Sequence, residues 1–277
     1  VVRGFGVIKI KIPKYVHSRG QGGQGISYLR ICNQDISLGS GSASSSPENF
    51  VIHSGVSSNF DYLVFLDSRG ATINKSGIST TVELLKDYFE SKQLSYLIIS
   101  KPFYLTVIPT LLSFCESVTA IATFGNIITN VGFVDTTPKK KDTLLDLKSQ
   151  LDYLNIDYVY QYLCNYILSN GDNEELGTMS ITETGILDIS NRLSRIDSNF
   201  FFINSPIVKY NTPFERNRPK CFFPQIIRSN DLVERIAVQT NSCLVDVSSI
   251  GIDTYDGVHY TDTGHKKYSN AILSCIY

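Results

Sequence analysis

Short apolar runs alternate with amphipathic segments from Phe60 onward. The continuous apolar run YLVFL at residues 62–66 is typical of a strand buried on both faces of a sheet. The first amphipathic segment begins at Thr80, where TTVE forms a capping box that predicts the start of a helix. Further strands are expected at 95–100, 118–124, 200–204 and 243–249, and further helices near 104–116, 142–168, 227–240 and 263–275.

Strands separated by helices predict parallel pairing through right-handed crossovers, and therefore an α/β fold. We expect a three-layer α/β/α sandwich with a mainly parallel sheet over residues 59–277. Residues 1–58 differ, because GVIKIKIPKYV, beginning at Gly6, alternates apolar and polar residues as a half-buried strand does. A Gly- and Ser-rich stretch begins at Gly39. We therefore predict a small β-rich N-terminal segment over 1–58 that ends in a linker.

Composition narrows the class of partner. A chain of 277 residues with 42% hydrophobic content can bury one large core. Its net charge of -1 offers no strongly basic face, so a nucleic-acid partner is not expected and a small or neutral one is. The longest apolar run, YLTVIPTLLSFC, is shorter than a bilayer span and contains a proline, so no transmembrane segment is expected.

The six cysteines lie far apart without a C-x-x-C pair, which disfavours zinc-ribbon and thioredoxin-type sites. Three disulfides and six buried thiols both remain open, and so does the oligomeric state. The chain begins at Val1 without a signal-like apolar stretch, so its compartment is also left open.

Polar residues follow three of the predicted strands: Asp67 and Ser68, then Gly125 and Asn126, then the Asp256–His259 segment. The carboxyl ends of parallel strands form the usual site of α/β sheets, so we expect these side chains to meet. A serine hydroxyl needs a base to take its proton, and the base needs an orienting carboxylate. An asparagine amide can donate to an oxyanion.

Three stretches together resemble blocks of the SGNH, or GDSL, hydrolase family: VFLDSRG, ATFGNIITN and DGVHYTDTGH. They occur in the family's order over roughly residues 60–277. The resemblance implies a flavodoxin-like fold that uses neither a cofactor nor a metal. It also implies that Ser68 is the nucleophile, His259 the base, Asp256 its acidic partner and Asn126 an oxyanion donor.

The stretch from Phe65 to Phe89 is most similar to carbohydrate O-acetylesterases, including viral sialate esterases. This similarity implies a serine esterase acting on a small acyl ester, an O-acetyl group on a carbohydrate, as a small-molecule or glycan substrate. A secreted or virion-associated protein is compatible with it.

Two other functions stay open. Leu66 stands where the family has glycine, Lys101 and Pro102 stand where its second block has one, and GNII lacks the Asp of GxND. These departures favour the same fold without catalysis, as a glycan-binding or virion structural module. The other alternative is a Rossmann-like transferase that uses a nucleotide cofactor, although no glycine-rich phosphate loop follows the first strand.

Other motifs have simpler interpretations. GQGGQG at 20–25 fits G-x-G-x-x-G, but strand-like ISYLRIC follows it, so a hairpin loop is expected rather than a dinucleotide site. His265 is expected to serve the first turn of the last helix or the surface, and His17 and His53 to be structural. The tyrosine-rich stretch DYVYQYLCNYIL, beginning at Asp157, is expected to pack in the core, with stacking of its rings on a sugar as the alternative.

Overall fold

A six-stranded sheet forms the centre of the molecule, with the strand order β12-β11-β7-β5-β6-β4. Its strands are β4 (Phe50–His53), β5 (Asn59–Asp67), β6 (Tyr96–Lys101), β7 (Thr123–Thr129), β11 (Asn199–Ile203) and β12 (Cys243–Val245). Neighbouring strands run parallel except β4, which pairs antiparallel with β6. The computed structural model describes residues 9–11, 26–31, 34–40, 50–54, 58–73, 75–101, 107–167, 173–208 and 218–276.

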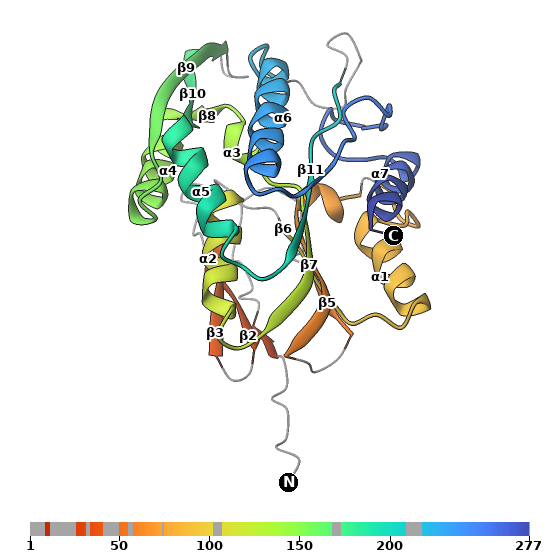
Figure 1. Ribbon diagram of the computed structural model, residues 1–277. Coiled ribbons are helices and arrows are strands. Elements are labelled where there is room, and N and C mark those ends of the chain that lie inside the picture. Colours follow the sequence, from red (N-terminus) through yellow and green to blue (C-terminus); the bar gives the residue numbers. More distant parts are fainter. Residues whose placement is uncertain are drawn as a thin grey trace.

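Helices cover both faces of this sheet (Figure 1). One face packs against α2 (Ile108–Val118), α4 (Lys141–Tyr153), α5 (Glu183–Leu193) and α6 (Phe222–Gln239). The other face packs against α1 (Thr81–Ser91) and α7 (Asp262–Cys275). The predicted three-layer α/β/α fold with a mainly parallel sheet is confirmed.

Residues 62–66 of β5 are all apolar because this part of the strand is buried on both faces of the sheet. Leu63 and Phe65 point into the core beneath α2, whereas Val64 and Leu66 point into the core beneath α1 and α7. All four side chains are fully buried. Burial of each contributes about 1.5 to 3 kcal/mol. This burial holds β5 inside the sheet and thereby positions its carboxyl end at Asp67.

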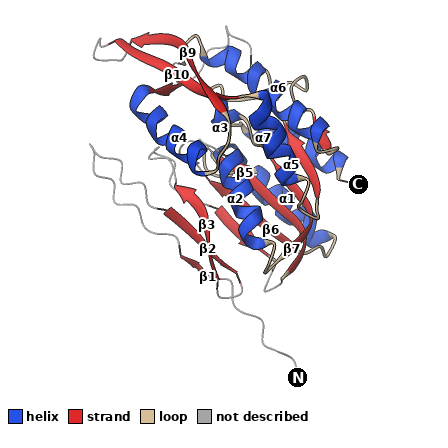
Figure 2. Cartoon of the chain, turned by 60° about the vertical axis from the view of Figure 1, so that its left-hand side comes forward, coloured by secondary structure: helices blue, strands red, loops and turns tan. Residues whose placement is uncertain are grey.

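The N-terminal part of the chain contributes strands to two different sheets. Strands β1 (Lys9–Lys11), β2 (Ile26–Ile31) and β3 (Gln34–Ser40) form a small antiparallel sheet of their own, seen in Figure 2. Strand β4, which lies within the predicted 1–58 segment, is an edge strand of the main sheet. The main sheet therefore begins before residue 59. The GQGGQG motif lies outside the described residues.

The predicted helix over 142–168 is wrong in its second half. Helix α4 ends at Tyr153, and Asn155 then takes a positive φ of 54°, a conformation that asparagine tolerates better than most residues. The chain continues as β9 (Tyr158–Ile167) and β10 (Asn173–Ile181), which form an antiparallel sheet with β8 (Lys139–Lys140). Tyr160 and Tyr162 on β9 are 49% and 51% exposed, so the expected core packing is wrong for both.

One disulfide occurs in the described part of the chain, between Cys164 on β9 and Cys221 directly before α6. The described thiols of Cys115, Cys243 and Cys275 are free. The sheet of β8, β9 and β10 is therefore covalently tied to the start of α6. Among the described residues, every helix is too short or too polar to pass through a lipid bilayer.

Candidate active site

Side chains from several strand ends lie together at the carboxyl edge of the main sheet. Ser68 directly follows β5, Asn130 follows β7, and Ser205 lies two residues after β11. The loop after β12 brings Asp256 and His259 to the same edge. This is the edge that the parallel-sheet rule predicts for a site.

The serine, the imidazole and the carboxylate form a continuous hydrogen-bonded array. Ser68 Oγ lies 3.3 Å from His259 Nε2, and His259 Nδ1 lies 2.9 Å from Asp256 Oδ2. Because an ionised carboxylate only accepts, Nδ1 carries the proton and Nε2 is free to accept from the serine hydroxyl. Ser68 is partly exposed, while the side chains of His259 and Asp256 are 18% and 9% exposed. A small molecule can therefore reach the hydroxyl while the carboxylate stays largely shielded.

The Asp256 side chain holds the conformation of the loop that carries Asp256 and His259. Asp256 Oδ1 accepts from the backbone N–H groups of Val258 and His259 at 3.0 and 2.8 Å. Gly257 between them has a φ of 82°, which an L side chain would rarely adopt. One carboxylate oxygen thus folds the turn, and the other orients the imidazole.

A second group holds the same carboxylate. Arg218 Nη2 donates to Asp256 Oδ2 at 2.8 Å, and its Nε donates to the backbone carbonyl of Asp256 at 3.1 Å. Burial opposes ionisation of Asp256, but the hydrogen bonds from His259 and the charges of His259 and Arg218 outweigh it. Together they hold the pKa of Asp256 well below its usual range. Asp256 is therefore a permanent carboxylate near neutral pH.

The turn that carries Ser68, called the Ser68 turn below, is fixed by a buried ion pair. Asp67 accepts from the backbone N–H of Arg69 at 2.9 Å and caps the short 3-10 helix Ser68–Gly70. The Arg69 guanidinium returns to the Asp67 carboxylate, with Nε and Nη2 each 2.9 Å from Oδ2. Both side chains are almost fully buried. Ser68 is thus presented on a turn whose two flanking residues are locked together.

Contacts from two other strands hold this turn. Asn130 at the end of β7 accepts from the Asp67 N–H at 2.8 Å and donates from Nδ2 to Asp67 Oδ1 at 3.1 Å. Arg69 Nη1 donates to Ser205 Oγ at 2.8 Å. The Arg69 guanidinium carbon also lies 4.3 Å from the ring centre of Phe133, a cation–π geometry. The roles of Asn130, Arg69 and Arg218 are absent from the sequence prediction.

The structure does not bring Asn126 to this site. Asn126 lies inside β7, in register with Tyr62, and its Nδ2 donates to the backbone carbonyl of Asp61. Tyr62 precedes Ser68 by six residues, which corresponds to roughly 20 Å along a strand. The expected oxyanion role of Asn126 is therefore wrong on position. The strand predicted at 118–124 is observed at Thr123–Thr129, so the amide at its end belongs to Asn130.

Two departures from the family pattern have structural outcomes. Leu66 does not take a positive φ, and its side chain is fully buried in β5, so it causes no backbone strain. Lys101 ends β6 in register with Asp67 and is buried, and this burial lowers its pKa to about 7. Pro102 lies outside the described residues. In the described part of the chain, no group of three or more His, Cys, Asp and Glu side chains could hold a metal ion.

His265 is fully buried rather than at the surface. Its Nδ1 accepts from the backbone N–H of Thr81 at 3.0 Å, at the first turn of α1. Its Nε2 lies 3.2 Å from the backbone carbonyl of Thr72, to which it donates. The imidazole is therefore neutral and ties α7 to α1 and to the segment that follows the Ser68 turn. Burial is the main cause that lowers the pKa of His265 below its ordinary value.

This burial predicts an acid-dependent loss of stability. Above the unfolded-state pKa, near 6.5, both states leave His265 neutral, and its contribution is fully present. As the pH falls below that value, the unfolded chain binds a proton that the folded chain refuses. We expect His265 to lower the free energy of unfolding by up to about 1 kcal/mol between pH 6.5 and 5.5. Urea unfolding at both pH values, compared with His265→Gln, measures it, and an equal pH slope in both proteins would contradict it.

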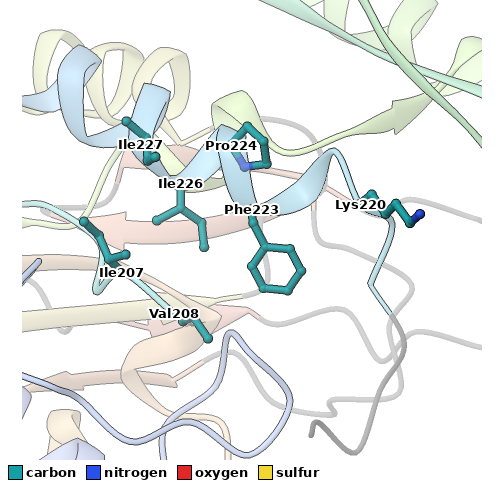
Figure 3. Close-up of a pocket in the computed structure, with 7 residues that line it drawn as sticks. All are labelled: Ile207, Val208, Lys220, Phe223, Pro224, Ile226 and Ile227. Atoms are coloured by element: carbon teal, nitrogen blue, oxygen red, sulfur yellow. The ribbon is translucent and has the colours of Figure 1, made fainter. Parts of the chain in front are cut away.

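An apolar recess of about 320 Å³ lies between the start of α6 and the segment that follows β11. Figure 3 shows its lining side chains, which come from the start of α6 and from the segment after β11: Ile207, Val208, Lys220, Phe223, Pro224, Ile226 and Ile227. Ile226 belongs to the same apolar cluster as Val258, the residue before His259. The lining of the recess and the loop of His259 thus contribute to one apolar cluster.

Comparisons with known proteins return solved structures only: no family model and no curated protein sequence matches the chain. It is similar to an acetyl xylan esterase at 14% identity, over 78% of this chain and 99% of that one, with a TM-score of 0.43. A carbohydrate acetylesterase from Sinorhizobium meliloti matches at 11% identity, over 78% and 99%, with a TM-score of 0.41. A GDSL-like lipase from Bacteroides thetaiotaomicron matches at 12%, over 78% and 87%, with a TM-score of 0.42.

Proposed function

We propose that the chain is a serine esterase that hydrolyses small acyl esters. The supporting observation is the array in which Ser68 Oγ lies 3.3 Å from His259 Nε2, while His259 Nδ1 lies 2.9 Å from Asp256 Oδ2. In this assignment Ser68 is the nucleophile, His259 the general base and Asp256 the carboxylate that orients it. These are the three roles that acyl transfer by a serine requires.

The reaction follows from the protonation states. His259 Nε2 takes the Ser68 proton as Oγ attacks the ester carbonyl, and the imidazolium is stabilised by Asp256. The imidazolium then gives the proton to the leaving alcohol. Water, activated by the same imidazole, attacks the acyl enzyme and releases the acid. The backbone N–H of Ser68, at the start of its 3-10 turn, is the proposed oxyanion donor.

The finer proposal is an O-acetyl ester on a carbohydrate. It is supported by the similarity of the stretch from Phe65 to Phe89 to carbohydrate O-acetylesterases. Release of acetate from an O-acetylated oligosaccharide, measured beside release from p-nitrophenyl acetate, tests the carbohydrate part separately from the chemistry.

Covalent labelling tests the nucleophile. A fluorophosphonate should label the chain with a stoichiometry near one, and peptide mapping should place the adduct on Ser68, because only a serine activated by a base reacts readily. Ser91 is the matched control, since it is an exposed serine whose Oγ donates to the backbone carbonyl of Tyr88. Absence of label in the folded chain would contradict the esterase. It would favour the same fold as a glycan-binding or virion structural module.

A further inference from the structure

Arg218 binds Asp256, the proposed acidic partner of His259. It donates from Nη2 to Asp256 Oδ2 at 2.8 Å, the same oxygen that receives His259 Nδ1 at 2.9 Å. Its second bond, from Nε to the Asp256 carbonyl at 3.1 Å, fixes the backbone of the same residue. The Arg218 side chain is only 11% exposed, so water screens this pair weakly.

The rings of Phe222 and Phe133 connect Arg218 to Arg69 in the Ser68 turn. The Arg218 guanidinium carbon lies 5.0 Å from the ring centre of Phe222. The Phe222 ring meets the Phe133 ring edge to face, with 5.8 Å between the centres. Arg69 lies over Phe133 in turn, at 4.3 Å. Two arginines, one for each half of the site, therefore rest on one pair of rings.

The backbone next to Arg218 is held by a disulfide and by apolar packing. Cys221, three residues after Arg218, forms the disulfide with Cys164 on β9. Phe222, Phe133 and Val258 belong to one buried apolar cluster. The backbone on which Arg218 sits is thus held covalently and by packing, so its guanidinium is preorganised before any substrate binds.

We propose that Arg218 is a positioning residue that fixes the Asp256 carboxylate and sets how strongly this carboxylate attracts the proton of His259. The inference rests on the proposed function. By occupying Oδ2, the guanidinium withdraws negative charge that would otherwise stabilise the imidazolium. Loss of the guanidinium should therefore strengthen the attraction between this carboxylate and an imidazolium.

Other titratable groups near His259 stay constant in the test. The Tyr255 ring on the same loop lies 5.9 Å from that of His259, and His265 on α7 interacts electrostatically with His259. The ion pair of Asp67 and Arg69, which flank Ser68, is also unchanged. Because these groups are unchanged when Arg218 alone is replaced, a change in pH dependence reports on Arg218.

The experiment compares Arg218→Met, Arg218→Gln and Arg218→Lys, with Arg192→Met as the matched control. Arg192 makes a comparable ion pair with Glu116 at 2.8 Å and a bond to the Leu154 carbonyl at 2.9 Å, away from the site. Loss of Arg218 should lower kcat for p-nitrophenyl acetate roughly 10- to 100-fold with little change in KM. It should also move the acidic limb of the kcat/KM profile upward by roughly half to one pH unit.

Arg218→Lys should return the acidic limb toward the wild-type pH, because the charge is restored, but recover kcat only in part, because the two-bond geometry is not. Arg192→Met should change neither quantity. An unmoved acidic limb in a folded Arg218→Met or Arg218→Gln protein would overturn the proposal.

A readout without turnover separates this outcome from failure of the esterase. The imidazole resonances of His259, followed by NMR across pH, should titrate at a higher midpoint in Arg218→Met than in the wild type. An equal midpoint would overturn the positioning role even in an active enzyme. A raised midpoint in a chain that hydrolyses no ester would support the role and remove the proposed function.

Discussion

The Ser68→Ala protein is expected to fold normally and to lose about 10⁴-fold or more in kcat/KM for p-nitrophenyl acetate. The hydroxyl is the only group removed, and it lies 3.3 Å from His259 Nε2. Because Ser68 is partly exposed, its truncation should change the free energy of unfolding by less than about 1 kcal/mol. Hydrolysis assays and urea unfolding measure the two quantities on the same preparation.

The array predicts a further, more specific result. His259→Ala should be nearly as inactive as Ser68→Ala, and the double variant should be no worse than either, because residues that act as one unit are not additive. Ser91→Ala is the matched control and should keep full activity, since Ser91 is exposed on α1. More than about a tenth of the wild-type turnover in Ser68→Ala would exclude it as the nucleophile.

Replacing Arg69 should produce the largest loss of stability. Arg69→Met leaves Asp67 buried at 1% exposure without its guanidinium partner, and breaking a buried ion pair in this way typically costs about 3 to 5 kcal/mol. The bond to Ser205 and the contact with Phe133 are lost as well. Urea unfolding at pH 7 should show a lower midpoint with a similar slope.

A double variant identifies the cause. Adding Asp67→Asn to Arg69→Met removes the uncompensated charge and should recover a large part of the lost stability. Arg195→Met, at an exposed position, should stay within about 0.5 kcal/mol of the wild type. If the free energy of unfolding falls by less than about 1 kcal/mol in Arg69→Met, the buried ion pair of Asp67 and Arg69 does not stabilise the Ser68 turn.

Local sequence patterns were enough to predict much of this molecule. The apolar run in β5 needed no tertiary context, because a strand buried on both faces must be apolar at every position. The end of that run indicated Ser68, and the DGVH turn indicated Asp256 and His259, because each signal lies within a few residues. The rule for parallel sheets then predicted the edge at which they lie.

Tertiary structure decided the features that depend on pairing and burial. Asn130, rather than Asn126, reaches the Ser68 turn because the register of β7 against β5 sets which residue ends the strand. The segment NIITN has an asparagine at each end, so the sequence alone does not show which of the two follows the strand. The extended path of β9 and its tie to Cys221 likewise depend on partners far away in the chain. No local sequence pattern indicates a role for Arg69 or Arg218. Their roles come from buried carboxylates that only the folded chain brings within reach, since an ion pair shielded from water depends on distance and solvent exclusion rather than on residue order.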